Sequence, residues 1–207
     1  MNSRRIGTAC MLLGTALILA ALSLFLWNRR EDAQAEQAVK QVLPQLIAQL
    51  EAPEETQAGA PLYPNLYDPA MTEVEIDGYA YIGYLSIPSL ELELPVMAQW
   101  DYERLKIAPC RYTGSAKTDD LVIAAHNYTK HFGLLQKLTA GDLVFFTDMD
   151  GIVSCYEAVS VEVLAPTDVE EMTAGEYDLT LFTCTYGGQS RLTLRCVRAE
   201  EASRRAG

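Results

Sequence analysis

The chain has 207 residues, a formal net charge of −12 and 49% hydrophobic residues. This length predicts one folded domain with an appendage, and the apolar content excludes wholesale disorder. The first 30 residues hold four arginines and no acidic residue, so the rest of the chain sets 12 basic against 28 acidic side chains. This balance argues against nucleic-acid binding and against charge-driven attachment to anionic lipid, because both need clustered lysine and arginine.

Residues 1–30 predict an N-terminal transmembrane anchor. Residues 6–27 form a run of 22 without a charge, which at ~1.5 Å per residue is long enough to cross a hydrocarbon layer of ~30 Å. Trp27 and the arginine pair after it are typical of a membrane interface. A cleaved signal peptide is the alternative, although its apolar region usually spans roughly 7–15 residues. Basic residues flank the run on both sides, so the charge pattern alone leaves the orientation nearly open.

Residues 31–72 predict a juxtamembrane helix and a linker. Apolar side chains recur at every third or fourth position from Val39 to Leu50, which is typical of a helix. Pro44 interrupts this pattern and is expected to kink or restart the helix. We favour a membrane-proximal stalk over a self-association helix. Four prolines within residues 51–72 indicate a linker or an extended arm.

Residues 73–198 predict the folded domain, and residues 199–207 a polar tail. Short alternating or continuous apolar runs bounded by turn residues indicate strands. Seven or eight such strands with little helix predict a mainly β fold, a closed or nearly closed barrel. A glycine-containing turn joins the last two strands into a hairpin. The expected strands are residues 81–87, 90–94, 121–125, 143–147, 153–163, 178–184 and 191–198.

Metal ligands and disulfides are not indicated by the cysteines and histidines. No cysteines form a C-x-x-C pair, and His126 and His131 lie five positions apart rather than four. We therefore expect no metal and no cofactor. Five cysteines are an odd number, so at least one thiol stays free. A bond between Cys155 and Cys196 across strands stays open at this point.

Two residues at strand ends could carry cysteine chemistry. Cys184 closes a strand and enters a glycine-containing loop, a placement that suits a nucleophile, although free cysteines are commonly inert and buried. His126 follows the apolar strand 121–125 and could exchange protons with a thiol at the same mouth of a barrel. The alternative is a solvent-exposed loop histidine. His131, beside Lys130, is expected at the surface.

Arg191 opens the strand after that of Cys184. Hairpin pairing would bring its guanidinium near the thiol, where it can hold a peptide carbonyl or a developing oxyanion. Arg195 has the same strand parity but lies two pairs further, roughly 13 Å along the strand at ~3.3 Å per residue. Arginines at strand ends are also commonly just solvated, so this position by itself is a weak signal.

The segment Thr180-Leu181-Phe182-Thr183-Cys184, followed by Arg191-Leu192-Thr193-Leu194, resembles the Cys-and-Arg hairpin of the sortases. Their pattern is T-L-x-T-C and then R-hydrophobic-x-hydrophobic. The resemblance extends over residues 79–198 in order, and includes residues 82–88, 94–96, 112–115 and 121–126. One departure is Ala125, where the family usually has glycine before the histidine.

This resemblance implies an eight-stranded sortase-type β-barrel and a membrane-anchored cysteine transpeptidase. Such enzymes cleave a C-terminal sorting signal similar to Leu-Pro-x-Thr-Gly and pass the acyl group to an amine of the cell wall or of a pilin. Cys184 would then be the nucleophile, His126 the general acid and base, and Arg191 the substrate and oxyanion ligand. The resemblance also implies a cytoplasmic N-terminus and an extracellular barrel on a Gram-positive-type cell.

The subclass and two other functions stay open. The short loop after Cys184 resembles class C-like enzymes, whereas the N-terminal helix and single anchor suit a class B-like enzyme. Tyr67-Asp68-Pro69-Ala70 could be a lid or an ordinary linker turn. The competing functions are a non-catalytic surface-binding module on the same barrel and a thiol peptidase without transfer. A redox thiol protein is weaker, because no resolving cysteine lies close in sequence.

Overall fold

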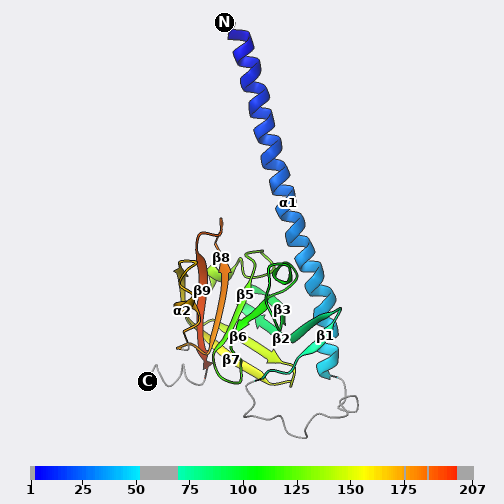
Figure 1. Cartoon of the computed structure of the whole chain (residues 1–207), viewed down its shortest axis with the longest axis vertical. Helices are drawn as coiled ribbons and strands as arrows, with labels where there is room; N and C mark the ends of the chain where they lie inside the picture. Colours follow the sequence, from blue (N-terminus) through cyan, green and yellow to red (C-terminus); the bar gives the residue numbers. More distant parts are fainter. Residues whose placement is uncertain (1–2, 52–69, 175, 186, 200–207) are drawn as a thin grey trace.

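A computed structural model describes residues 3–51, 70–174, 176–185 and 187–199 (Figure 1). Helix α1 (Ser3–Glu51) extends far beyond a β-barrel that packs beside its C-terminal end. It contains the candidate membrane span, and its large apolar side chains from Met11 to Trp27 are exposed. The expected anchor and juxtamembrane helix are one continuous helix with Pro44 inside it. Proline removes one intrahelical donor there without ending the helix.

Eight strands close the barrel. The sheet order is β1-β2-β3-β4-β5-β8-β9-β7-β6, and β6 also pairs with β2, so that only β1 lies outside the ring. This confirms the predicted mainly β, eight-stranded barrel. The strands are β1 (Val74–Ile76), β2 (Tyr79–Ile87), β3 (Leu92–Met97), β4 (Cys110–Thr113), β5 (Leu121–Ala125), β6 (Leu143–Asp148), β7 (Val153–Leu164), β8 (Leu179–Cys184) and β9 (Arg191–Arg198).

Short helical turns connect several strands. In the described residues, three are 3₁₀ turns, at Pro88–Leu90, Arg104–Lys106 and Leu135–Lys137, and the fourth is helix α2 (Val169–Met172). The expected start of strand 90–94 is wrong. Leu90 ends the first of these turns, Glu91 takes a left-handed conformation with φ of 53°, and β3 begins only at Leu92. Strands β1 and β4 had no counterpart among the expected strands.

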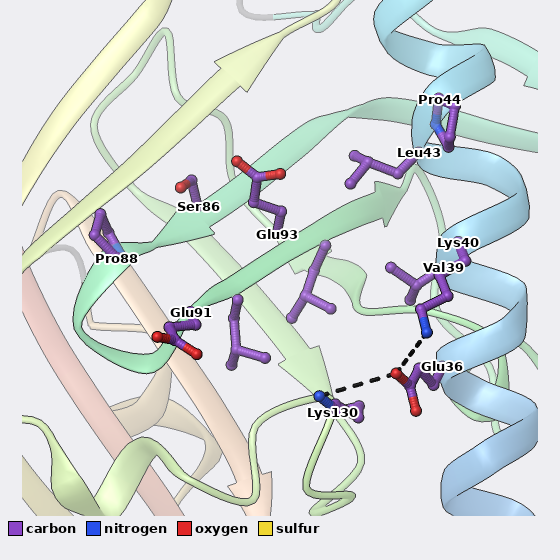
Figure 2. Close-up of a pocket in the computed structure, with 12 residues that line it drawn as sticks. Glu36, Val39, Lys40, Leu43, Pro44, Ser86, Pro88, Glu91, Glu93 and Lys130 are labelled. Atoms are coloured by element: carbon purple, nitrogen blue, oxygen red, sulfur yellow. Dashed lines mark ion pairs between the residues drawn. The ribbon is translucent and has the colours of Figure 1, made fainter.

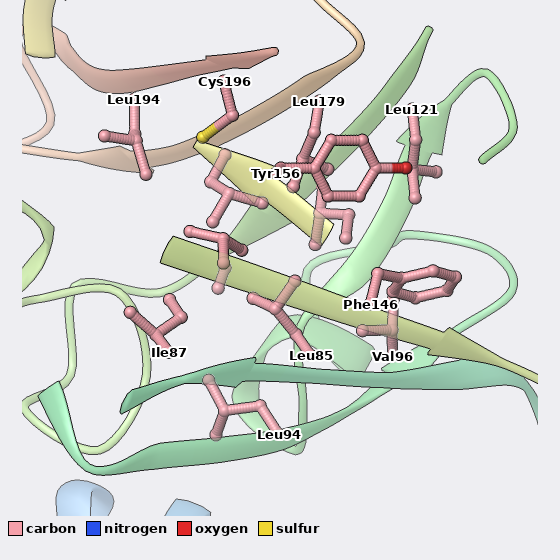
Figure 3. Close-up of a cluster of buried hydrophobic side chains, with 14 of the residues drawn as sticks. Leu85, Ile87, Leu94, Val96, Leu121, Phe146, Tyr156, Leu179, Leu194 and Cys196 are labelled. Carbon is pink, nitrogen blue, oxygen red and sulfur yellow. The ribbon is translucent and has the colours of Figure 1, made fainter. Parts of the chain in front are cut away.

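Strand alternation divides the barrel side chains between its inside and its outside. Along β5, Leu121, Ile123 and Ala125 belong to the interior cluster, together with Leu179 and Leu181 of β8. Figure 3 shows how side chains of this cluster from several strands converge. The intervening residues Val122, Ala124 and Phe182 belong to a second cluster on the outer face. Residues that continue this second parity therefore point out of the barrel.

Arg195 is buried on the outer face of β9 and holds the chain around α2. Its guanidinium donates to the carbonyl oxygens of Met172, at 3.0 Å, and Glu171, at 2.6 Å. It also bonds Thr180 Oγ1 at 3.1 Å and pairs with the Glu162 carboxylate. Burial of the arginine is tolerated because these partners replace the water that it loses. Arg195 is therefore a structural residue.

Replacing Arg195 should destabilise the barrel. We expect Arg195→Met to lower the free energy of unfolding by about 3 kcal/mol, because it leaves the buried carbonyls without their donor. Urea unfolding followed by tyrosine and tryptophan fluorescence measures this change. The surface variant Lys137→Met, in the exposed turn after Leu135, is the control and should stay within about 0.5 kcal/mol of the wild type. Equal stabilities of the two variants would contradict the structural role.

Candidate active site

Parallel pairing of β5 with β8 brings His126 and Cys184 together. Ala125 pairs with Thr183 in this register, so the next residues along the chain, His126 and Cys184, leave the two strands side by side. Neighbouring strands lie about 4.8 Å apart. Both residues continue the outer parity set by Ala124 and Phe182. The imidazole and the thiol therefore emerge on the same side, at the same end of the barrel.

The β8–β9 hairpin adds Arg191 to the same place. Arg191 is the register partner of Cys184, and directly paired residues of antiparallel strands project to the same face. The connecting loop is closed by Thr185, whose amide donates to the Ser190 carbonyl at 3.0 Å and whose hydroxyl lies 2.8 Å from the Ser190 hydroxyl. Gly187 and Gly188 both have positive φ angles, of 85° and 71°, which favour glycine.

The Arg191 guanidinium lies over its own loop. Nη1 donates to the carbonyl oxygens of Gly188 and Ser190, each at 3.2 Å. Within the described part of the chain, Nε and Nη2 have no hydrogen-bond partner. A guanidinium carries five N–H donors in a fixed fork, so one side can be held by the loop while the other engages a ligand.

His126 is half-buried and stacked on Tyr128. Their ring centroids lie 4.8 Å apart at an interplanar angle of 30°. Its Nε2 is buried without a hydrogen-bond partner among the described residues. Burial lowers the pKa of His126, while the Glu31 carboxylate raises it and Lys106 lowers it further. The lowered pKa favours the neutral imidazole at neutral pH, which can accept a proton.

Ala125, the departure from the family pattern, points away from this site. Its side chain is buried in the interior cluster with Leu121 and Ile123, on the opposite face of β5 from His126. The additional methyl group therefore packs in the core. It does not share the outer face with the imidazole.

Cys184 differs from Cys110 and Cys196 in its exposure, and shares its half-buried state with Cys155. Its thiol is free and half-buried, whereas Cys110 and Cys196 are buried and burial raises the pKa of both, that of Cys110 to about 12. Cys155 is free as well, and the register partner of Cys196 on β7 is Ala158, so Cys155 and Cys196 form no disulfide. No three His, Cys, Asp or Glu side chains of the described segments gather as a metal site.

The surface position expected for His131 is wrong. Its exposed fraction is 0%, because the loop after His126 folds back and packs it beside Tyr128, with ring centroids 5.5 Å apart. Both ring nitrogens lack a hydrogen-bond partner within the described residues. Burial, reinforced by His126, lowers the pKa of His131 to about 4. Neither this burial nor the stacking of Tyr128 on His126 was anticipated, since nothing in the local pattern distinguishes these rings from solvated ones.

Comparison with known proteins identifies the family. Residues 85–199, more than half of the chain, match the family model described as Sortase domain. The chain belongs to the sortase family. This confirms the resemblance inferred from the sequence and makes the chain a sortase transpeptidase in general. No curated protein matches it in sequence.

Solved sortases have similar folds. Sortase C1 of Streptococcus agalactiae is 26% identical with a TM-score of 0.53, and the match covers 60% of this chain and 70% of that one. Sortase C-3 of Streptococcus pneumoniae is 23% identical with a TM-score of 0.52, over 82% and 90% of the chains. A Clostridium perfringens sortase D5 transpeptidase is 16% identical with a TM-score of 0.58, over 80% and 98%. The last two likenesses support the fold alone.

Three expectations fall wholly or partly on residues outside the described ranges. The linker or extended arm expected within residues 51–72 is described only at residues 51 and 70–72. The lid considered at Tyr67-Asp68-Pro69-Ala70 includes three residues that the structure does not describe, and the expected tail at residues 199–207 is described only at Ala199. The structure therefore does not test these three expectations.

Buried His131 should make the sortase sensitive to acid. Its folded pKa of about 4 lies below the ordinary value of 6.5. Between these two pH values, the unfolded chain therefore binds a proton at His131 that the folded chain does not bind. The stability that neutral His131 contributes is fully present above the unfolded pKa of 6.5 and is lost as the pH falls toward the folded pKa of about 4. Integrated at 1.36 kcal/mol per unit, about 2 kcal/mol is lost between pH 7 and pH 4.5.

Urea unfolding at pH 7 and pH 4.5 measures this loss. We expect His131→Phe, which keeps an aromatic ring and cannot titrate, to lose about 2 kcal/mol less than the wild type. All other titrating groups are present in both proteins and cancel in the comparison. An identical pH dependence of the two proteins would contradict the buried neutral state of His131.

Proposed function

We propose that this sortase cleaves a C-terminal signal similar to Leu-Pro-x-Thr-Gly through a thioacyl intermediate and transfers the acyl group to an amine. Cys184 is the nucleophile, His126 the general acid and base, and Arg191 the oxyanion ligand. The observation that carries this proposal is the register of β5, β8 and β9, in which all three residues occupy neighbouring strand ends on one face. Membership in the sortase family supports the same roles.

Acylation begins with the neutral imidazole. His126 accepts the Cys184 proton, and the thiolate attacks the carbonyl carbon of the scissile peptide bond. The carbonyl oxygen becomes an oxyanion, to which Arg191 donates N–H groups that its loop leaves unengaged. When the C–N bond breaks, the imidazolium gives its proton to the leaving amine. The products are a thioester on Cys184, a free amine and a neutral His126.

Transfer reverses these roles with a second amine. The incoming nitrogen attacks the thioester carbon, and His126 removes the proton that this nitrogen loses. The C–S bond then breaks, and Cys184 leaves as a thiolate that recovers a proton from the imidazolium. The net reaction exchanges one amide bond for another, without an oxidant or a cofactor. The accepting amine belongs to a cell-wall precursor or to a pilin lysine, and the substrate is a secreted protein with the sorting signal.

Helix α1 supports a proposed location of the enzyme at the cell membrane. Its apolar, exposed first half is the candidate membrane span. We place the N-terminus in the cytoplasm and the barrel outside, because secreted substrates and cell-wall amines are found on that side. Residues 1–30 are then the anchor and residues 73–198 the extracellular catalytic domain.

Removing the thiol tests the nucleophile. We expect Cys184→Ala to abolish cleavage of quenched fluorescent peptides containing Leu-Pro-x-Thr-Gly, because it removes the thiol whose strand end is paired with that of His126. The matched control is Cys155→Ala, which removes another half-buried strand thiol and should cleave at the wild-type rate. Melting curves of both variants show whether the barrel stays folded. Cleavage by folded Cys184→Ala would contradict the assignment of Cys184 as the nucleophile.

The same assay separates the competing functions. A peptide vinyl sulfone should label Cys184 of the wild type, whereas a non-catalytic binding module would leave it unlabelled. Product analysis by mass spectrometry with an added amine should give the amide adduct. Hydrolysed product alone would indicate a thiol peptidase without transfer.

The proposed role of Arg191 predicts a loss of kcat/KM that another positive charge at this position does not fully restore. We expect Arg191→Ala to lower kcat/KM by roughly 10²-fold or more, as for an oxyanion donor. Arg191→Lys keeps the charge without the planar fork, so its recovery should be partial. The control Lys137→Ala removes an exposed cation elsewhere and should leave kcat/KM unchanged. A wild-type kcat/KM for Arg191→Ala would contradict the assignment.

A further inference from the structure

The juxtamembrane part of α1 touches the loop that follows His126. The Asp32 carboxylate accepts hydrogen bonds from the Thr129 backbone amide, at 3.2 Å, and from the Thr129 hydroxyl, at 3.4 Å. One turn further along, the Glu36 carboxylate lies 3.9 Å from Lys130 Nζ. Figure 2 shows this second pair, with Glu36 on the helix and Lys130 at the tip of its loop. Two consecutive loop residues are therefore held by one helix face.

The contact is made by the side of the helix that faces the barrel. Ala35, between the two acidic residues, is fully buried, and Val39 is buried in the next turn. Next to this contact, the helix and the β2–β3 hairpin border an open groove of about 600 Å³, lined in part by Val39, Leu43 and Leu92. The helix thus packs incompletely on the hairpin, and its polar contacts at Asp32 and Glu36 attach it to the loop itself.

The loop that receives these contacts is compact and includes His126. The Phe132 amide donates to the His126 carbonyl at 3.1 Å, and the amides of His131 and Gly133 donate to the Tyr128 carbonyl at 3.0 and 2.9 Å. A Cβ atom at Gly133 would lie 2.5 Å from the Asn127 carbonyl oxygen, so the two ends of this turn pack closely against each other. A displacement of Thr129 is therefore passed to the neighbouring Tyr128.

Tyr128 completes the connection to the imidazole. Its ring stacks on the His126 ring on one side and contacts His131 on the other. The helix also acts on His126 through charge, because the Glu31 carboxylate raises the pKa that burial lowers. Residues 31–36 of α1 therefore act on the imidazole indirectly through Thr129 and Tyr128, and also through the charge of Glu31.

We propose that residues 31–36 of α1 position the active site, with Asp32 holding Thr129 so that Tyr128 keeps the His126 ring in place. Asp32 is thus a positioning residue, and the anchor helix does more than tether the barrel. The inference rests on the proposed role of His126. Asp32 lies five residues after Trp27, about 7.5 Å along a helix, so the same contact holds the catalytic loop close to the end of the uncharged run of residues 6–27.

The test uses the full chain in lipid nanodiscs and the sorting-signal peptides described above. We expect Asp32→Ala to lower kcat by about 10- to 100-fold with little change in KM, because the imidazole loses its alignment while the peptide still binds. Asp32→Asn should recover most of the activity, since its amide oxygen still accepts from the Thr129 amide. The matched control is Gln41→Ala, which breaks a contact between α1 and Asp77 on another part of the barrel. Its kcat should stay at the wild-type value.

A second measurement does not depend on activity. Hydrogen–deuterium exchange of the peptide spanning residues 127–133 should be faster in Asp32→Ala than in the wild type, and unchanged in Gln41→Ala. Wild-type kcat together with wild-type exchange in Asp32→Ala would overturn the inference. So would an equal loss in Gln41→Ala, which would indicate general loosening of the helix.

The failure of this inference differs from the failure of the proposed function. If the wild type cleaves the peptide and His126→Asn does not, the proposed function stands, and the Asp32 variants decide the inference alone. If His126→Asn cleaves as fast as the wild type, the proposed role of His126 fails, and the inference about its positioning is overturned with it.

Discussion

Parallel pairing between β5 and β8 is the constraint on which the proposed chemistry depends. These strands are separated in the chain by β6, β7 and α2, yet their register places Ala125 beside Thr183. The residues that follow each strand are consequently neighbours, with side chains on the outer face. The antiparallel hairpin then adds Arg191 opposite Cys184. Strand pairing provides rigid placement with backbone hydrogen bonds, and leaves the side chains free to meet a ligand.

Side chains of the same type have different roles in this protein because they differ in burial. Cys110 and Cys196 are enclosed in apolar clusters, where the thiolate is strongly disfavoured, whereas Cys184 stands half-exposed at a strand end. Arg195 and Arg191 have the same parity on β9, but the first is enclosed by carbonyls near α2 and the second lies over an exposed loop. The structural cysteines and the structural arginine thus differ from the proposed catalytic residues of the same type in how far they are removed from water.

Much of the barrel could be predicted from short-range patterns. The alternation in β3 and the apolar run of β5 are local properties, and the glycines between β8 and β9 indicate their hairpin directly. Strands β1 and β4 escaped prediction because they are short: the alternation in β1 covers only three residues, and the four residues of β4 show none. The burial of His131 also escaped, because its environment comes from the fold of its loop. The docking of Asp32 on Thr129 joins residues 97 positions apart, which no local pattern reveals.

The amino-acid sequence by itself determined the long apolar N-terminal segment, the mainly β texture and the resemblance that singled out Cys184, His126 and Arg191. These follow from residue types and spacings that act over a few positions. Only the tertiary structure decided which strand ends are neighbours, which histidine and arginine are enclosed, and where helix α1 meets the barrel. The physical reason is that pairing register and desolvation depend on segments remote in the chain, whose contacts form together when the barrel closes.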